Sequence, residues 1–163
     1  MPISTGDRLP EATLTRMTAN GPEQVSLSDK TSGRKVVIFG VPGAFTPTCH
    51  SAHVPSFVRT FGQFADKGVD EIICVAVNDP FVVKMWADDT GAEAAGITML
   101  ADPDSSYTKS IGMNFSAPPV GFYDRSIRYA MLVEDGVVKI LNVEETRGVC
   151  EATAGEGLLA AMG

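Results

Sequence analysis

The residues with the richest chemistry in this chain lie between positions 41 and 55, in the stretch VPGAFTPTCHSAHVP. Cys49 stands in its middle, with His50 beside it and His53 a few positions later. A cysteine in this setting could pack in a core, form a disulfide, bind a metal or act as a nucleophile. The neighbouring residues, and the elements that position them, decide which of these roles fit Cys49.

Thr46 and Pro47 predict a helix that begins just before Cys49. Thr is favoured as an N-cap and Pro at the first helical position, so Cys49 falls in the first turn. The N–H groups of a first turn have no partner in the helix, and their partial positive charge favours a thiolate. Cys49 is therefore a candidate nucleophile, although a small buried core residue would occupy the same helix position equally well.

The histidines and cysteines do not complete a metal site. Structural zinc needs four ligands, whereas this chain has two histidines and three widely spaced cysteines: Cys49, Cys74 and Cys150. We expect no metal and no cofactor. His53 follows Cys49 by about one helical turn and could share its face, so we interpret it as a packing or supporting residue, whereas His50 points elsewhere.

Strands and helices alternate around this stretch. Residues 35–42 and 71–77 are nearly continuous apolar runs rich in β-branched side chains, typical of strands covered on both faces. Helices are predicted over 48–67, ending at Lys67-Gly68, and from Pro80 onward. The remaining predicted elements are a hairpin of 12–17 with 23–29, a strand over 97–102, a short helix over 105–112, strands over 127–136 and 137–145 joined at Asp135-Gly136, and a last helix over 151–163.

This order of elements predicts an α/β fold with a central mixed sheet, flanked by helices and preceded by an N-terminal hairpin. It fits a thioredoxin-like fold, although periodicity alone establishes only an α/β protein with a central sheet. We find no repeat and no linker, so residues 1–163 are expected to form a single domain.

Composition excludes several classes of protein. The net charge is −7, so the chain lacks the basic surface that binds nucleic acid or anionic lipid. No apolar run is long enough for a membrane span, and the first residues do not resemble a secretion signal. With an odd, dispersed set of cysteines, we expect a soluble protein of a reducing compartment, the cytoplasm.

Pro42, Thr46 and Cys49 spell P-x-x-x-T-x-x-C directly after a predicted buried strand. With other blocks in the same order, this motif resembles the peroxiredoxins, most closely their type II (peroxiredoxin-five) branch, over nearly the whole chain. The other matching blocks are His53 and Pro55, VNDPFVVKMW at 77–86 and RYAMLVEDGVVKILNVEE at 128–145.

The resemblance implies a thioredoxin-like thiol peroxidase that reduces hydrogen peroxide and alkyl hydroperoxides. Cys49 would attack the peroxide and become a sulfenic acid. Thr46 and first-turn N–H groups would donate hydrogen bonds, Arg128 would supply a fixed positive charge, and Pro42 would shield the pocket. Arg125 is the rival of Arg128, but its place in the Asp124-Arg125-Ser126 loop suggests a solvated charge.

Three routes back to the thiol remain open. Cys74 matches the resolving cysteine of plant-like members, although a cysteine in an apolar strand is more often inert core. Cys150 lies where animal-type members carry theirs. Glutathione, glutaredoxin or thioredoxin could instead reduce Cys49 directly.

A different class of function also stays open: a peroxide-sensing redox switch or binding module with little turnover. The resemblance further implies a homodimer, whose contacts we expect in the loop 45–48 and the segment 79–86. Within that segment, Phe81 and Trp86 are expected to be core residues at helical spacing.

Overall fold

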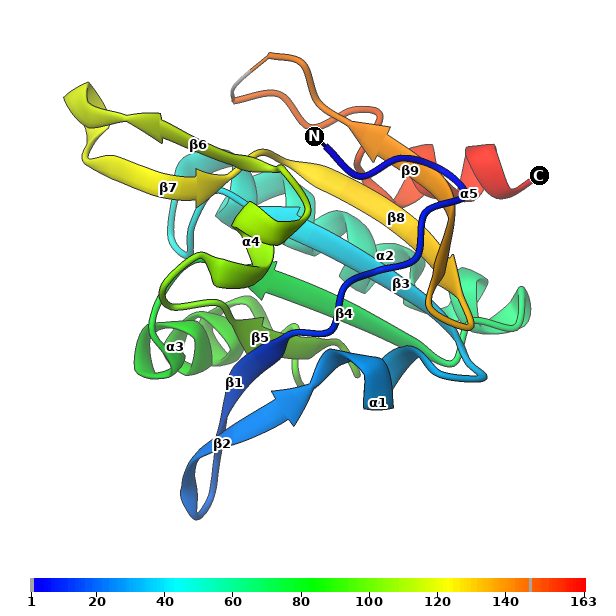
Figure 1. Cartoon of the computed structure of the whole chain (residues 1–163), viewed down its shortest axis with the longest axis horizontal. Coiled ribbons are helices and arrows are strands. Elements are labelled where there is room, and N and C mark those ends of the chain that lie inside the picture. Colours follow the sequence, from blue (N-terminus) through cyan, green and yellow to red (C-terminus); the bar gives the residue numbers. More distant parts are fainter. Residues whose placement is uncertain (1, 147) are drawn as a thin grey trace.

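A mixed sheet forms the centre of the computed structural model, which describes residues 2–146 and 148–163 (Figure 1). Within this part of the chain the sheet has seven strands in the order β2-β1-β5-β4-β3-β8-β9. The strands are β1 (Thr13–Thr18), β2 (Gly21–Ser26), β3 (Lys35–Val41), β4 (Glu71–Ala76), β5 (Thr98–Ala101), β8 (Tyr129–Glu134) and β9 (Val137–Val143). β3 pairs with β4 in parallel and with β8 in antiparallel orientation. The predicted mixed sheet and N-terminal hairpin are confirmed.

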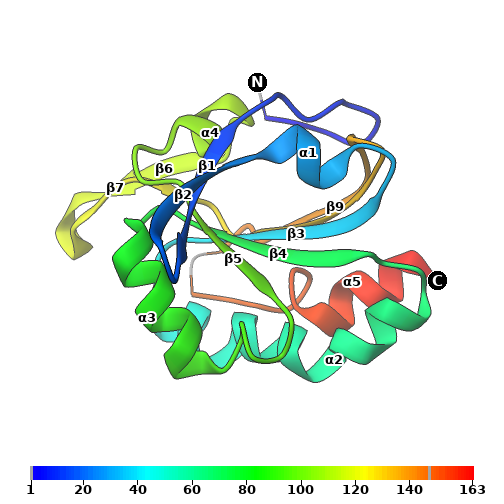
Figure 2. The same cartoon turned by 90° about the horizontal axis from the view of Figure 1, so that it is seen from below.

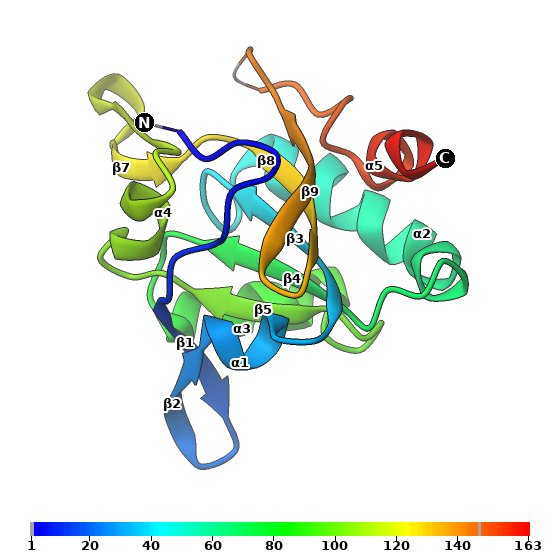
Figure 3. The same ribbon diagram turned by 45° about the vertical axis from the view of Figure 1, so that its right-hand side comes forward.

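Helices cover both faces of the sheet (Figure 2). One face carries α2 (Val54–Asp66), α3 (Pro80–Thr90) and α5 (Gly155–Met162). The other carries α1 (Leu27–Thr31), α4 (Ser106–Ser110) and the N-terminal segment, which crosses the sheet beside β9 in Figure 3. In the described part of the chain, no helix has the length and apolar character that a membrane crossing requires.

The apolar run of β3 is uniform because its alternate side chains enter two different cores. Val37 and Phe39 pack on the face of α2, α3 and α5, whereas Val36 and Ile38 pack on the opposite face. Since successive side chains of a strand point to opposite sides, a strand covered on both faces needs apolar residues throughout. Cys49 and Cys74 belong to the core beneath α2, α3 and α5.

Two predicted boundaries follow from local chemistry. Asp79 caps α3 by accepting a hydrogen bond from Val82 N at 2.9 Å, with Pro80 as the first helical residue. Asp135 and Gly136 join β8 to β9 with φ of 49° and 76°, as a type I′ hairpin turn requires.

Two local predictions are wrong. The strand expected over 23–29 ends at Ser26, because the Ser26 hydroxyl accepts from Asp29 N and starts α1. Residues 114–126, to which no strand was assigned, form a hairpin of β6 (Asn114–Ala117) and β7 (Phe122–Ser126) around a 3₁₀ turn, η2 (Pro118–Val120). This hairpin projects from the main sheet (Figure 1).

Candidate active site

Cys49 lies where the chain leaves the end of β3 and enters a helix. The helix begins at Pro47, so the predicted start after Thr46 and the first-turn position of Cys49 are confirmed. The turn before it is tight: Phe45 has φ of 63°, a left-handed conformation that is unfavourable for a bulky side chain. The Cys49 side chain is fully buried in the core beneath α2, α3 and α5.

Thr46 makes a different hydrogen bond from the one expected. Its hydroxyl donates to Gly43 O at 2.7 Å. A hydroxyl has one hydrogen and two lone pairs, so Thr46 Oγ1 offers an acceptor to a neighbouring ligand. In this conformation the Thr46 hydrogen is used by Gly43 O, and Arg128 is the side-chain donor to the Cys49 sulfur.

The helix widens at the cysteine into a π-helical turn, η1 (Cys49–His53), before α2 continues. Val54 N donates to Cys49 O, five residues back. Pro55 explains the widening, because its ring nitrogen cannot donate to the carbonyl four residues earlier and its ring crowds that carbonyl. Pro55 was the sequence signal for this irregularity.

Arg128 connects the two residues that face one another across this turn. Its Nη2 donates to Cys49 Sγ at 3.3 Å, and its Nη1 lies 2.9 Å from His53 Nδ1. Arg128 stands immediately before β8 and is almost fully buried, with 5% of its surface exposed. The planar guanidinium fork matches two acceptors at once, which an ammonium group does not do.

His53 is neutral in this arrangement. Its Nδ1 faces the arginine donor, and its Nε2 lies 2.9 Å from Thr153 O, which can only accept. The single ring proton is therefore on Nε2. Complete burial, and then the positive charge of Arg128, lower the pKa of His53 well below its usual 6.5. Its geometry agrees with the supporting position inferred from the sequence.

Arg125 is not the solvated loop charge expected from its sequence context. It belongs to β7 and is partly buried, with Nη1 donating to Pro42 O at 3.1 Å and the guanidinium lying 5.0 Å from the centre of the Phe122 ring. The guanidinium lies directly over Gly43, where an added side chain would displace it. Arg125 thus braces the turn that leads to Cys49, while Arg128 contacts the sulfur.

The other two cysteines occupy contrasting environments, and no disulfide joins any cysteines of the described chain. Cys74 is buried in β4, opposite Phe39 of β3, and burial raises the pKa of its thiol well above the usual value. Cys150 is half-buried in the segment between β9 and α5. Burial also raises the pKa of Cys150, while a hydrogen bond from Thr153 opposes that shift.

Glu144, which the sequence did not single out, organises the segment that carries Cys150. Its carboxylate accepts from Thr153 N at 3.0 Å, from Thr153 Oγ1 at 2.5 Å and from Glu151 N at 3.2 Å. Burial alone would raise the pKa of Glu144, but these hydrogen bonds lower it on balance. The segment is also joined to the cysteine helix, because Thr48 Oγ1 donates to Gly148 O at 2.9 Å.

An apolar groove of about 640 Å³ opens beside this site. Arg128 is one of its lining residues and also contacts the buried Cys49. Pro42, predicted to shield the pocket, is one of its walls, and a smaller depression of about 430 Å³ adjoins it. The other lining residues are mostly apolar: Phe45, Thr46, Pro47, Thr48, Phe115, Val120, Phe122 and Gly148.

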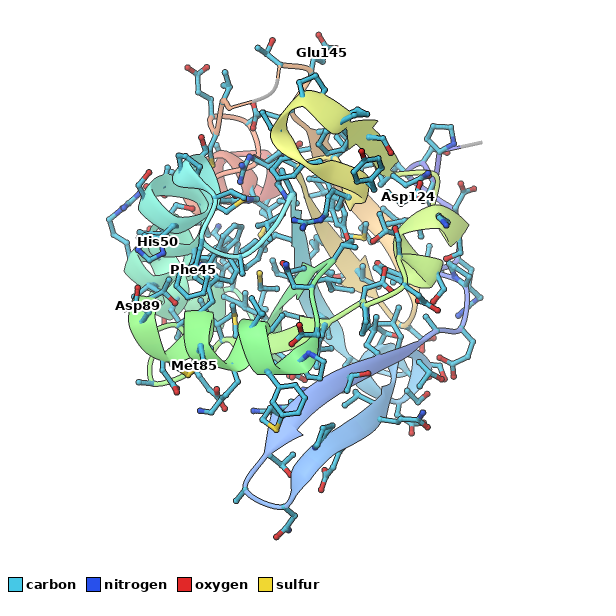
Figure 4. The ribbon with its side chains drawn as sticks, turned by 90° about the vertical axis from the view of Figure 1, so that its left-hand side faces the viewer. Phe45, His50, Met85, Asp89, Asp124 and Glu145 are labelled. Atoms are coloured by element: carbon cyan, nitrogen blue, oxygen red, sulfur yellow. The ribbon has the colours of Figure 1, made fainter. Side chains whose placement is uncertain are left out.

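Residues 2–146 and 148–163 contain no cluster of three or more His, Cys, Asp or Glu side chains that could hold a metal ion. His50 points away from Cys49, as expected, and lies against α3. Figure 4 shows it at the surface near Phe45 and Asp89.

Comparisons with known proteins agree with this geometry. The model of the Redoxin family matches residues 4–158. Peroxiredoxin-2E-2 of Oryza sativa subsp. japonica, a chloroplastic protein, is 44% identical over 162 residues, covering 97% of this chain and 72% of the relative.

Two solved structures share the whole fold. Reduced Prx3 from Vibrio vulnificus in complex with H2O2 superposes with a TM-score of 0.92 at 43% identity, covering 99% of both chains. Peroxiredoxin 5 from Alvinella pompejana gives a TM-score of 0.85 at 30% identity, covering 99% of this chain and 98% of that one.

Proposed function

This chain belongs to the Redoxin family and is a peroxiredoxin, an antioxidant thiol peroxidase, and we propose that Cys49 is its peroxidatic nucleophile. The observation that carries this assignment is the hydrogen bond of 3.3 Å from Arg128 Nη2 to Cys49 Sγ. A permanent cation in contact with a buried sulfur stabilises the thiolate, which is the reactive form. Neither Cys74 nor Cys150 has such a contact among the hydrogen bonds of the described residues.

The reaction transfers one oxygen to sulfur. The Cys49 thiolate attacks the terminal oxygen of a hydroperoxide, so that an S–O bond forms while the O–O bond breaks. The sulfur is oxidised to sulfenic acid. The departing alkoxide, or hydroxide when the substrate is hydrogen peroxide, takes up a proton and leaves as alcohol or water.

Arg128 stabilises the charge that moves along the S–O–O line in the transition state. Its buried guanidinium needs no reorganisation during the step, because His53 and Cys49 hold it in place. First-turn N–H groups add donors on the helix side, and Thr46 Oγ1 accepts the hydrogen of the incoming hydroperoxide. Pro42 has no N–H and limits the approach of water.

The groove supports alkyl hydroperoxides as substrates alongside hydrogen peroxide. Phe115, Val120 and Phe122 offer an apolar surface beside Arg128, large enough for an alkyl chain. An apolar tail would lie on these residues while the peroxide group reaches Cys49 past Arg128. The polar end of the substrate is thereby oriented toward the sulfur.

Reduction requires a thiol, which we propose is supplied by a thioredoxin-type system, glutaredoxin or glutathione. The thiol attacks the sulfenic sulfur, releases water and forms a disulfide, which a second thiol then reduces to regenerate Cys49.

We further propose that Cys150 rather than Cys74 acts when an internal thiol resolves Cys49. Cys74 lies in β4, paired on both sides by β3 and β5, whereas Cys150 lies in a connecting segment. All three cysteines, Cys49, Cys74 and Cys150, are free thiols, which fits a reducing compartment such as the cytoplasm.

We also propose that two copies of this chain form a homodimer through the exposed face of α3. Phe81 and Met85 are each 64% exposed, so the expected core position of Phe81 is wrong, whereas Trp86 is fully buried as expected. These two residues are four positions apart and share one side of α3. Phe45 is 51% exposed and lies on the same face of the molecule as Met85 (Figure 4). A second copy of this chain would cover this apolar patch, formed by Phe45, Phe81 and Met85.

The central experiment is steady-state peroxide consumption with a thioredoxin or glutaredoxin system. Cys49→Ser should abolish turnover, while the parent chain should turn over many times per molecule. Peroxidase activity retained by Cys49→Ser would overturn the assignment. A parent chain that is oxidised once and then stops would instead support the redox-switch alternative.

A further inference from the structure

His50 joins the cysteine turn to α3 through the only tryptophan in the sequence. Trp86 Nε1 donates to His50 Nδ1 at 3.1 Å, and His50 Nε2 lies 3.6 Å from Asp89 Oδ2. An indole N–H can only donate, so Nδ1 must be the acceptor and the proton of neutral His50 is on Nε2, facing Asp89. Figure 4 shows His50 and Asp89 on one surface of the molecule.

One other tether of this region lies near α3, because Ala44 N donates at 2.8 Å to Asn78 Oδ1, two residues before the helix. The remaining side-chain contacts lead to other parts of the chain. His53 binds Arg128 and Thr153 O, and Thr48 binds Gly148 O. Among the described residues, His50 is the member of η1 whose side chain forms a hydrogen bond with α3. The contact therefore attaches the turn next to Cys49 to a rigid, buried part of a second helix.

The indole N–H of Trp86 has His50 as its hydrogen-bond acceptor. The Trp86 side chain is fully buried while the partly exposed His50 lies over it, so in the closed arrangement His50 Nδ1 accepts from the indole N–H in place of water. Moving η1 outward would exchange the Trp86–His50 hydrogen bond for one to water, which loses the net contribution of an intramolecular hydrogen bond. The closed position of η1 is stabilised to that extent.

Reduction of Cys49 needs such a movement. The sulfur is fully buried, and a thiol must approach it closely enough to form an S–S bond. Peroxide oxidation, in contrast, uses the closed arrangement, in which Arg128 contacts the sulfur.

We propose that His50 is a positioning residue that holds Cys49 closed by docking on Trp86, and so sets how often the sulfur becomes accessible to thiols. This inference rests on the proposed role of Cys49. Two helices then determine how often Cys49 is exposed to thiols. The cysteine turn leads into α2, and α3 supplies the buried donor that holds this turn in place.

The test compares His50→Leu with His50→Asn in the reduced full-length protein. Leu removes the acceptor, whereas the Asn Oδ1 can accept from Trp86 in place of Nδ1. The measurement is the rate at which a maleimide labels Cys49, assigned by peptide mass spectrometry. We expect His50→Leu to accelerate labelling about three- to tenfold, and His50→Asn to return it to within about twofold of the parent.

Trp86→Phe tests the same hydrogen bond from the other side, because it keeps an aromatic ring and removes the donor. It should accelerate labelling as His50→Leu does, and the double variant should be no faster than either single one. Parental labelling rates in His50→Leu, equal acceleration in His50→Asn, or additive effects in the double variant would each overturn the inference. Circular dichroism and thermal unfolding verify that every variant is folded.

Labelling requires no peroxide, so its outcome is separate from that of the peroxidase assay. A parent chain without peroxidase activity would overturn the proposed function while leaving the labelling comparison interpretable. Normal peroxidase activity with unchanged labelling in His50→Leu would overturn only the role of His50.

Discussion

Arg128 and Cys49 are separated by 79 positions in the sequence, yet Nη2 of the arginine donates to Sγ of the cysteine at 3.3 Å. The contact exists because β8, which follows Arg128, pairs with β3, which precedes the cysteine helix. The sheet register therefore brings the cation to the thiol.

Replacing Arg128 by Lys should slow the oxidation of Cys49 by about 10²- to 10³-fold, because lysine keeps a charge but loses the fork that binds Cys49 and His53 together. Stopped-flow oxidation by hydrogen peroxide measures the rate. Arg125→Lys is the matched control, since Arg125 donates to Pro42 O. An equal loss in both variants would contradict the assigned role of Arg128.

Stability should fall at acidic pH because of His53. The unfolded chain protonates this histidine near its usual pKa of 6.5, whereas burial and the charge of Arg128 keep the pKa of the folded form well below that value. Below pH 6.5 the unfolded state therefore binds more protons, and stability decreases as pH falls, until the folded-state pKa is reached. This single group contributes a slope of up to about 1.4 kcal/mol per pH unit.

Urea unfolding of the parent chain and of His53→Gln, measured at several pH values, checks this prediction. Glutamine does not titrate, so the variant should lose that part of the slope, while His50 remains in both proteins. Identical pH slopes in the two proteins would show that His53 does not protonate on unfolding as inferred.

Internal resolution should run through Cys150. After treatment with a single equivalent of peroxide, mass mapping under non-reducing conditions should detect a Cys49–Cys150 disulfide, and Cys150→Ser should remove it. Cys74→Ser should leave that disulfide in place, because the Cys74 thiol is buried in β4 with a raised pKa. A Cys49–Cys74 disulfide would reverse the assignment, and a mixed disulfide with an added thiol as the sole product would favour direct external reduction.

The dimer proposal predicts that Met85→Glu produces monomers. A charge placed in an apolar interface loses its hydration without a partner, whereas at an exposed position it costs little. Sedimentation velocity measures the oligomeric state. Val120→Glu serves as the control, because Val120 is similarly exposed, at 63%, but lies at the tip of the β6–β7 hairpin. A parent chain that sediments as a monomer would rule out this interface.

Sequence reasoning succeeded where the determining interactions are local. The start of the cysteine helix follows from Thr46 and Pro47, and the buried character of β3 from its unbroken apolar run. The α3 start at Asp79-Pro80 follows equally from adjacent residues. Each depends on contacts within a few positions, so the order of residue types contains the required information.

Apart from the strand end at Ser26, which a local helix cap decides, the main errors concern residues whose surroundings come from distant parts of the chain. Arg125 was assigned to a solvated loop, because nothing near it in sequence indicates Pro42 or the β6–β7 hairpin. Phe81 was assigned to the core because helical spacing cannot show which side of α3 the sheet covers. Pro55 was visible, but a proline inside a helix can kink, end or widen it, so the π-helical turn was not predicted.

By itself, the sequence determined most elements of the central sheet and its helices, and a nucleophile in the first turn of a helix, since strand patterning and helix capping are local properties. Tertiary structure decided what that nucleophile contacts. The pairing of β8 with β3 brings Arg128 to Cys49, and the packing of α3 brings Trp86 to His50. Such contacts depend on which strands pair and which helix faces are covered, and residue spacing along the chain encodes neither.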